Sequence, residues 1–239
     1  FILRRALMGG YMFNVMVVNS KGGAGKTTLS TNIASYYAKS NYKTALIDYD
    51  SQGSSTFWLK RRPETAPPIQ SIAAYKPNSN VTRSWFLCPE VDTQRVVVDS
   101  PAGIDVATFR NNFAQADAII IPVLPSAIDI HAVSHFIADL LLIAKVNKSD
   151  GKMVVVANRA RKNTLVYQQL EKFLGSLGIA FITTLRDTQN YVKASEQGLG
   201  IFEIGGGTIC RDLETWQPLL DWLDHRAHLA NQGAHTRLG

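Results

Sequence analysis

The sequence predicts one α/β domain built on a mainly parallel β-sheet with helices on both faces. Short apolar runs rich in Val and Ile alternate with longer amphipathic segments along the 239 residues, as expected for successive β-α-β units. Continuous apolar runs suit strands that are buried on both faces of a sheet. The least regular segment, residues 61–80, is too short to separate two domains, so we expect a single domain over residues 12–228.

Six strands are expected, at residues 13–19, 43–49, 94–99, 117–123, 152–157 and 179–183. Helices are expected between them, at residues 26–39, 104–115, 128–147, 163–176 and 211–228. The proline-rich segment 61–80 is expected to be a surface excursion. Residues 1–11 precede MFNVMVVNS, which looks like a natural start, and are therefore expected to be upstream or added sequence. We expect residues 229–239 to form a flexible tail.

The composition gives a modest basic excess. Lys and Arg number 25 against 19 Asp and Glu, for a net charge of +6 and a pI of about 9.3. This balance suits a polyanionic partner such as nucleic acid, and it equally fits a soluble protein that happens to be basic. The two cysteines lie far apart without a C-x-x-C pattern, so we expect a reducing cytosol and neither a zinc site nor a disulfide framework.

Residues 19–30, NSKGGAGKTTLS, follow a predicted strand and open a predicted helix. In this context glycines let backbone N–H groups converge on a phosphate at the helix N-terminus. Lys26 is expected to reach the β- and γ-phosphates, the Thr27 hydroxyl to bind Mg²⁺, and Thr28 to contact the α-phosphate. The sequence therefore predicts a P-loop NTPase domain with ATP and Mg²⁺ as cofactors.

The stretch KGGAGKTT resembles the deviant Walker A motif of the ParA/MinD family of dimeric ATPases. The resemblance implies that Lys21 reaches across a homodimer, formed in the ATP state, to the phosphates bound by the partner chain. It also implies that the loop binds nucleotide through Gly22, Gly23, Ala24 and Gly25 as well as Lys26, Thr27 and Thr28.

Three aspartates end apolar strands, where a parallel sheet places a nucleotide and its metal. ALIDYDSQGS is similar to the D-x-D-P-Q-G segment of the family, which implies that Asp48 holds the water shell of Mg²⁺ and that Asp50 positions the attacking water. Ser51 departs from the usual proline. VVVDSPAG resembles a Walker B strand followed by switch II, so Asp99 would bind Mg²⁺ through water and the amide near Gly103 would sense the γ-phosphate.

Asn158 ends another predicted strand and has two interpretations. The resemblance implies an adenine contact, whereas Asn is also common as a helix cap. The stretches IIIPVLPSAIDI and TTLRDTQNYVKASEQGLGIFE are similar to short ParA-type partition ATPases, so the similarity extends from about residue 13 to residue 224. The phosphate loop lies close to the amino end, and a helix-turn-helix that binds an operator is therefore not expected.

The resemblance also implies nonspecific DNA binding by the ATP dimer through basic residues of the C-terminal half. Such contacts would be directed at phosphates and would weaken steeply with salt. Each basic residue alone could equally be a solvated surface charge. The candidates are Arg159, Arg161, Lys162, Arg186, Lys193 and Arg211. The run Lys60-Arg61-Arg62 is a further candidate, in what we expect to be a mobile loop beside the first switch.

Three alternatives remain within this fold. A MinD-like membrane protein needs a basic amphipathic C-terminal helix, whereas the segment here carries several acidic residues that anionic lipid would repel. An iron–sulfur relative needs cysteines after the Walker B strand, and Cys88 precedes it while Cys210 is remote in the chain. A ligase of the dethiobiotin-synthetase type needs a substrate pocket whose residues cannot be identified from the sequence.

The sequence thus predicts a Mg²⁺-dependent ATPase of the short ParA type. By resemblance, the ATP dimer binds nucleoid DNA in the cytoplasm, and a small adaptor protein stimulates hydrolysis. The cargo would be a plasmid, a chromosome region or a carboxysome, and no membrane partner is expected.

Overall fold

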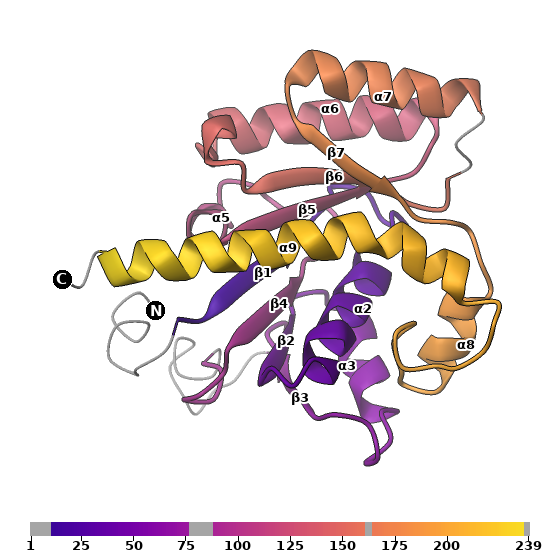
Figure 1. Cartoon of the computed structure of the whole chain (residues 1–239). Helices are drawn as coiled ribbons and strands as arrows, with labels where there is room; N and C mark the ends of the chain where they lie inside the picture. Colours follow the sequence, from indigo (N-terminus) through magenta and orange to yellow (C-terminus); the bar gives the residue numbers. More distant parts are fainter. Residues whose placement is uncertain (1–10, 77–87, 161–163, 237–239) are drawn as a thin grey trace.

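The computed structural model describes residues 11–76, 88–160 and 164–236, which form one parallel sheet between two layers of helices (Figure 1). The seven strands lie in the order β3-β2-β4-β1-β5-β6-β7, and each pairing is parallel. The predicted α/β fold with a mainly parallel sheet is therefore confirmed. The strands are β1 (Phe13–Val17), β2 (Thr44–Asp48), β3 (Ile69–Ala73), β4 (Arg95–Asp99), β5 (Ala118–Val123), β6 (Met153–Ala157) and β7 (Ala180–Thr184).

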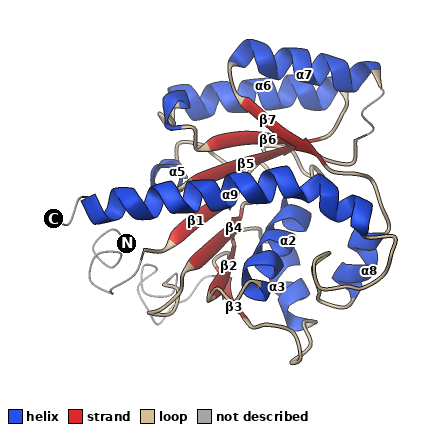
Figure 2. Ribbon diagram, viewed as in Figure 1, coloured by secondary structure: helices blue, strands red, loops and turns tan. Residues whose placement is uncertain are grey.

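Each pair of consecutive strands other than β3 and β4 is connected through a helix, as β-α-β units require (Figure 2). The helices are α2 (Lys26–Lys39), α3 (Ser54–Lys60), α5 (Arg110–Gln115), α6 (Ala127–Leu142), α7 (Leu165–Leu177), α8 (Asn190–Glu196) and α9 (Cys210–Thr236), with a short 3₁₀ helix, η1 (Lys148–Asp150). In Figure 1, α9 runs across the sheet on the side of α2 and α3, whereas α6 and α7 contribute residues to the core on the opposite face.

Alternate residues of each strand contribute to one of two hydrophobic cores, as the period of two in a strand requires. In β1, Val15 and Val17 join the core beneath α2 and α9, where Trp216 is completely buried. Met16 points to the opposite core, which contains Phe136 from α6 and residues of α5 and α7. Both faces of the sheet are thus buried, which explains the continuous apolar runs of the central strands.

All six predicted strands are present, and four short elements among the described residues were missed: α3, α8, β3 and the 3₁₀ helix η1. Helices α3 and α8 span seven residues each, and β3 occupies part of the segment predicted to be an irregular excursion. The prediction of an irregular surface excursion is therefore wrong for residues 69–73. Its last residues, 77–80, lie outside the described residues. The helix predicted at 104–115 begins only at Arg110.

The C-terminal helix is longer than predicted, because α9 extends to Thr236. Residues 229–236 are therefore helical, which corrects the prediction of a flexible tail beginning at residue 229. The physical reason is anchoring near this end: Ala227 is buried, and Ala230 packs against the core. In addition, the Arg226 guanidinium donates hydrogen bonds to the backbone oxygens of Asp117 and Asp150.

Candidate nucleotide-binding site

The phosphate loop connects β1 to α2 at the carboxyl edge of the sheet, where the sequence placed it. Its entrance is fixed by the buried Asn19 side chain, which donates to the Pro122 oxygen at 2.6 Å and accepts from the Lys21 amide at 2.9 Å. Gly25 is the N-cap of α2 and has φ +94°, a left-handed conformation that side chains disfavour. The loop therefore presents the N-terminus of α2, the arrangement that binds phosphate.

Asn158 lies against this loop. Its side chain is buried and donates through Nδ2 to the Ala24 oxygen at 2.9 Å, while its Oδ1 accepts from the Arg159 amide. A Cβ at Gly25 would lie only 1.9 Å from Asn158 Nδ2. The interpretation of Asn158 as a helix cap is wrong, because Thr164 caps the following helix, α7. Asn158 also lines the cavity described below, so its predicted adenine contact stays open.

The two lysines of the loop have different environments. Lys26 is buried, and its Nζ donates to the Lys21 backbone oxygen at 2.9 Å. Burial lowers the pKa of Lys26, while the carboxylates of Asp99 and Asp50 act in the opposite direction. Lys21 instead points to α6, where its Nζ lies 2.9 Å from Asp129 Oδ1.

Asp99 is the most buried acid of the site and accepts hydrogen bonds from hydroxyl groups of two helices, α2 and α3. Thr27 Oγ1 donates to its Oδ2 at 2.8 Å, Ser55 Oγ donates to the same oxygen, and Ser30 Oγ lies 3.3 Å from Oδ1. Burial raises the pKa of Asp99 to about 6, against the opposing effect of the hydrogen bonds from Ser55 and Thr27. The structure therefore brings Thr27 and Asp99 together as predicted.

Asp48 lies beside Asp99, because the two residues are register partners at the ends of β2 and β4. Its Oδ2 accepts from both the amide and the hydroxyl of Thr56, at 2.8 and 2.9 Å, and its Oδ1 accepts from the Asp50 amide at 3.0 Å. Burial raises the pKa of Asp48 despite these hydrogen bonds. A cation would relieve the cost of burying two neighbouring carboxyl groups, and their oxygens are the ligands that Mg²⁺ prefers.

Asp50 and Gly103 lie in the two segments that the resemblance predicts to be switches. Asp50 is half-buried, and its Oδ1 accepts from the Gln52 amide at 3.0 Å within a turn that leads into α3. Gly103 is exposed at φ +65°, and its amide donates to the Ser20 oxygen at 2.8 Å. The amide predicted to sense a γ-phosphate is thus bonded to the phosphate loop itself.

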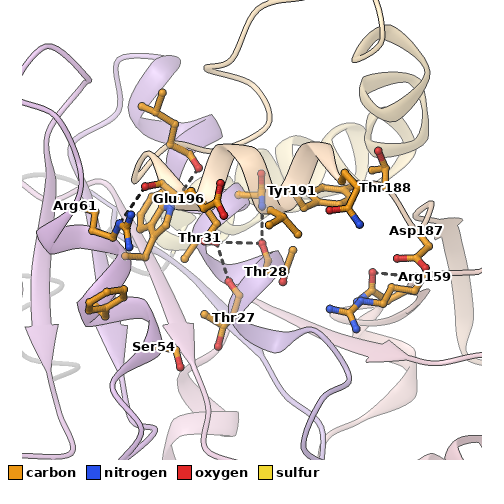
Figure 3. Close-up of a pocket in the computed structure, with 18 of the residues that line it drawn as sticks. Thr27, Thr28, Thr31, Ser54, Arg61, Arg159, Asp187, Thr188, Tyr191 and Glu196 are labelled. Atoms are coloured by element: carbon orange, nitrogen blue, oxygen red, sulfur yellow. Dashed lines mark hydrogen bonds between the residues drawn. The ribbon is translucent and has the colours of Figure 1, made fainter.

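A cavity of about 730 Å³ opens beside the start of α2. Figure 3 shows Thr27, Thr28 and Thr31 in its middle, with Arg61 toward one end and Arg159 toward the other. Helix α3, helix α8 and the segment that precedes α8 supply the remaining wall, including Phe57, Trp58, Asp187, Thr188 and Tyr191. The volume falls within the usual range for small-molecule sites, and it adjoins the helix N-terminus where phosphate would bind.

The candidate DNA contacts differ in availability. Lys193 and Arg211 are exposed, and Arg159 is exposed at the rim of the cavity. Arg186 is 44% exposed and forms an ion pair with the fully buried Asp212, so part of its role is structural. The remaining two candidates, Arg161 and Lys162, lie outside the described residues.

The run Lys60-Arg61-Arg62 was predicted as a mobile loop beside the first switch, and this is wrong. Lys60 ends α3, and Arg61 Nε donates to the Glu196 oxygen at 3.0 Å. Arg62 forms an ion pair with Glu203 in which both side chains are 6% exposed. These contacts attach α3 to the segment around α8 and bury the Arg62 cation away from solvent.

Sequence reasoning missed three residues of the site. Ser55, Thr56 and Asp129 each contact a predicted residue, but Ser55 and Thr56 follow the interpreted segment ALIDYDSQGS, and Asp129 was given no role within IIIPVLPSAIDI. The hydroxyl-rich start of α3, SST, directly follows the predicted first switch and could have indicated the two partners of the acids. Asp129 has no comparable signal, because its contact with Lys21 joins positions 108 residues apart.

Comparison with known proteins agrees with this geometry. Residues 15–201 match the family described as the CobQ/CobB/MinD/ParA nucleotide binding domain. The chain is 28% identical to the maintenance of carboxysome distribution protein A of Halothiobacillus neapolitanus, over 81% of this chain and 88% of the relative. It is 25% identical to the septum site-determining protein MinD of Thermotoga maritima, over 85% and 86% of the two chains.

The fold also matches solved structures. A McdA variant from Cyanothece in complex with ATP superposes with a TM-score of 0.64, at 16% identity, over 88% of this chain and 97% of that one. Together with the family match, this confirms the predicted resemblance to ParA/MinD-type ATPases. Among the helices of the described residues, none combines the length and apolar character that a membrane span requires.

Proposed function

Because the chain belongs to the CobQ/CobB/MinD/ParA family of nucleotide-binding domains, we propose that it works as an ATP-dependent homodimer with Mg²⁺ as cofactor. The observation that carries the proposal is the convergence of Lys26, Thr27 and Asp99 at the N-terminus of α2, beside a cavity large enough for a nucleoside. In this arrangement the triphosphate occupies the loop, and the base and ribose extend into the cavity.

Each residue of the loop then has a defined task. The backbone amides of Gly22, Gly23, Ala24 and Gly25 surround the phosphates. Lys26 exchanges its hydrogen bond with the Lys21 oxygen for the phosphate oxygens, and the buried position of its ammonium strengthens that interaction. Thr28 contacts the α-phosphate, and Asn158 lies where it can both hold the loop and contact the adenine.

The metal site consists of the Thr27 hydroxyl with Asp99 and Asp48, both acting through water. Bound Mg²⁺ would neutralise charge that develops on the phosphates. Asp50 positions the attacking water, and its place next to Asp48 at the end of β2 supports this role. Gly103 couples the second switch to the γ-phosphate by releasing its amide from the Ser20 oxygen.

The second lysine turns the nucleotide pocket into a dimer switch. Lys21 is half-exposed at the edge of the loop, with its ammonium outside its own phosphate-binding site. In the ATP dimer it contacts the phosphates of the partner chain. ATP then controls assembly, because the ligand of this lysine is present only when the opposite site is filled.

We assign nonspecific DNA binding to the exposed cations Lys193, Arg211 and Arg159, with the partly paired Arg186 as a supporting contact. Arg161 and Lys162 remain candidates from the sequence. A small adaptor protein stimulates hydrolysis and releases the dimer from nucleoid DNA in the cytoplasm. The names of similar proteins support a carboxysome, a chromosome region or a plasmid as the cargo.

One experiment tests the nucleotide assignment. Lys26→Ala removes the buried ammonium and should abolish binding of a fluorescent ATP analogue, because the phosphates lose their central charge. Lys172→Ala, at an exposed position of α7, serves as the matched control and should bind like the wild type. Unchanged ATP affinity in Lys26→Ala would reject the assignment of the loop.

A second experiment tests the assigned partner. The double variant Lys193→Ala/Arg211→Ala should bind ATP normally but bind DNA more weakly, with a shallower dependence on salt.

A MinD-like membrane role is disfavoured because the apolar side chains Trp216, Leu219 and Leu223 of α9 are buried in the core. Strong ATP-dependent binding to anionic liposomes, without DNA binding, would favour that alternative.

A further inference from the structure

We propose that Asp129 is an intramolecular counter-ion of Lys21. Lys21 must leave this carboxylate before it can contact a second chain, so Asp129 raises the dissociation constant of the dimer. The inference rests on the proposed function, because it concerns a lysine that acts on a second chain. Its observation is independent of that function: the ammonium of Lys21 is bound to an acid of its own chain, at 2.9 Å. The proposed function gives neither side chain a contact with the nucleotide of its own chain.

The carboxylate of Asp129 is held in place by contacts that do not involve Lys21. Asp129 lies in the first turn of α6, and its amide donates to the Oγ of Ser126, the N-cap of this helix, at 3.1 Å. In return, the Ser126 hydroxyl donates to Asp129 Oδ2. The positive end of the helix dipole also favours a negative charge at this position. Oδ1 is thereby left to receive the ammonium, and the side chain is only 13% exposed.

The backbone of Lys21 is fixed, whereas its side chain is accessible. Its amide donates at 2.9 Å to Oδ1 of Asn19, whose buried side chain is itself bonded to the Pro122 oxygen. The side chain beyond this anchored backbone is 35% exposed and bridges from the loop to α6. Rotation of the side chain alone can therefore exchange Asp129 for another anion without disturbing the phosphate loop.

The ion pair between Lys21 and Asp129 is weak enough to change the dimer dissociation constant without preventing dimer formation. An ion pair that is partly exposed favours its bound geometry by only about 1.4- to 5-fold. A triphosphate on a second chain carries several negative charges and can therefore outcompete the single carboxylate. Before such a partner arrives, Asp129 neutralises Lys21. Because every dimer must break two such pairs, the dissociation constant of the dimer should depend on the square of this factor, about 2- to 30-fold.

The test measures dimerisation of the full chain loaded with the non-hydrolysed analogue AMPPNP and Mg²⁺, by sedimentation velocity over a range of protein concentrations. Asp129→Asn keeps the shape of the side chain and removes its charge, and it should lower the dimer dissociation constant by about 2- to 30-fold. Asp139→Asn removes one negative charge from an exposed position of the same helix and is the matched control, with no expected change. An unchanged or higher dissociation constant for Asp129→Asn would overturn the inference.

Two further variants separate this inference from the proposed function. Lys21→Ala should lose the AMPPNP-dependent dimer, and Lys21→Ala/Asp129→Asn should behave like Lys21→Ala, because the counter-ion acts only through the lysine. If Lys21→Ala still dimerises like the wild type, the proposed action across the dimer fails. If Lys21→Ala abolishes the dimer while Asp129→Asn leaves it unchanged, only the role of Asp129 fails. Thermal unfolding of each variant without nucleotide verifies that α6 remains folded.

Discussion

Substitution of the glycines in the phosphate loop should show how the backbone and Asn158 together define the site. Gly25→Ala introduces a side chain at φ +94° and places its Cβ 1.9 Å from Asn158 Nδ2. Gly23→Ala imposes a similar backbone strain at φ +77°, but its Cβ meets nothing within 4 Å. Gly22→Ala would meet only Ala102 Cβ at an ordinary 3.9 Å. The three variants therefore separate backbone strain from collision.

The expected magnitudes follow from these differences. Left-handed backbone costs a residue with a Cβ about 1–2 kcal/mol, which is the whole expected effect of Gly23→Ala. Gly25→Ala must also displace the Asn158 amide from the Ala24 oxygen, and a buried hydrogen-bonding group that loses its partner costs about 1–3 kcal/mol. The total for Gly25→Ala is therefore about 2–5 kcal/mol of unfolding free energy, while Gly22→Ala should stay within about 0.5 kcal/mol of the wild type.

Urea denaturation without nucleotide measures these values, and thermal unfolding provides a second reading. For a chain of this size, the expected loss in Gly25→Ala lowers the melting temperature by roughly 4–20 °C. The double variant Gly25→Ala/Asn158→Ala should lose less stability than the sum of the single variants, because the amide that the new Cβ meets is gone. If Gly25→Ala is no less stable than Gly23→Ala, the contact between Asn158 and the loop does not constrain the backbone, and the reasoning fails.

Two other predictions concern the contacts of α3. Arg62→Ala leaves the buried Glu203 carboxylate without its counter-ion, with only the Gly200 amide still donating to it, and should cost about 3–5 kcal/mol in urea denaturation. Lys43→Ala, which removes an exposed ion pair, should cost less than about 1 kcal/mol. Equal effects of the two variants would contradict the buried pair. Ser55→Ala removes a hydroxyl from Asp99 and should cost about 1–3 kcal/mol when measured in EDTA; full stability there would indicate that the hydroxyl is not needed to satisfy the acid.

The fold was predictable wherever local pattern and burial agree. The central strands are buried on both faces, so their apolar runs were unambiguous. Strand β3 was missed because it lies at the sheet edge, is only partly buried, and carries the polar residues Gln70 and Ser71. Helices α3 and α8 are two turns long, too short for a periodic apolar face to be recognised. The end of α9 depends on anchoring by Arg226, a contact that no local pattern reveals.

In the candidate site, too, the residues of a local motif were predictable and their distant partners were not. Lys26 and Thr27 were predictable because their chemistry is tied to short, fixed spacing between a strand and a helix. Their partners depend on tertiary structure: Ser55 reaches Asp99 from 44 residues away, and Asp129 reaches Lys21 across 108 residues. Surface charge was the least informative signal. Among the basic candidates, Arg186 is tied to a buried acid, which its position in the sequence did not indicate.

Helix α3 connects Asp99 and Asp48, the acids proposed to bind the metal, to the outer wall of the cavity. Its first turn supplies Ser55 to Asp99 and Thr56 to Asp48, and its side chains line the cavity beside α8. Its far end is attached to the segment after α8 by the ion pair of Arg62, which is buried and cannot loosen without a large cost. A ligand that replaces Ser55 at Asp99 therefore acts on a short helix whose other end is attached beside α8. Because the first turn of α3 directly follows the segment that holds Asp50, we expect occupancy of the proposed metal site to change the shape of the cavity wall.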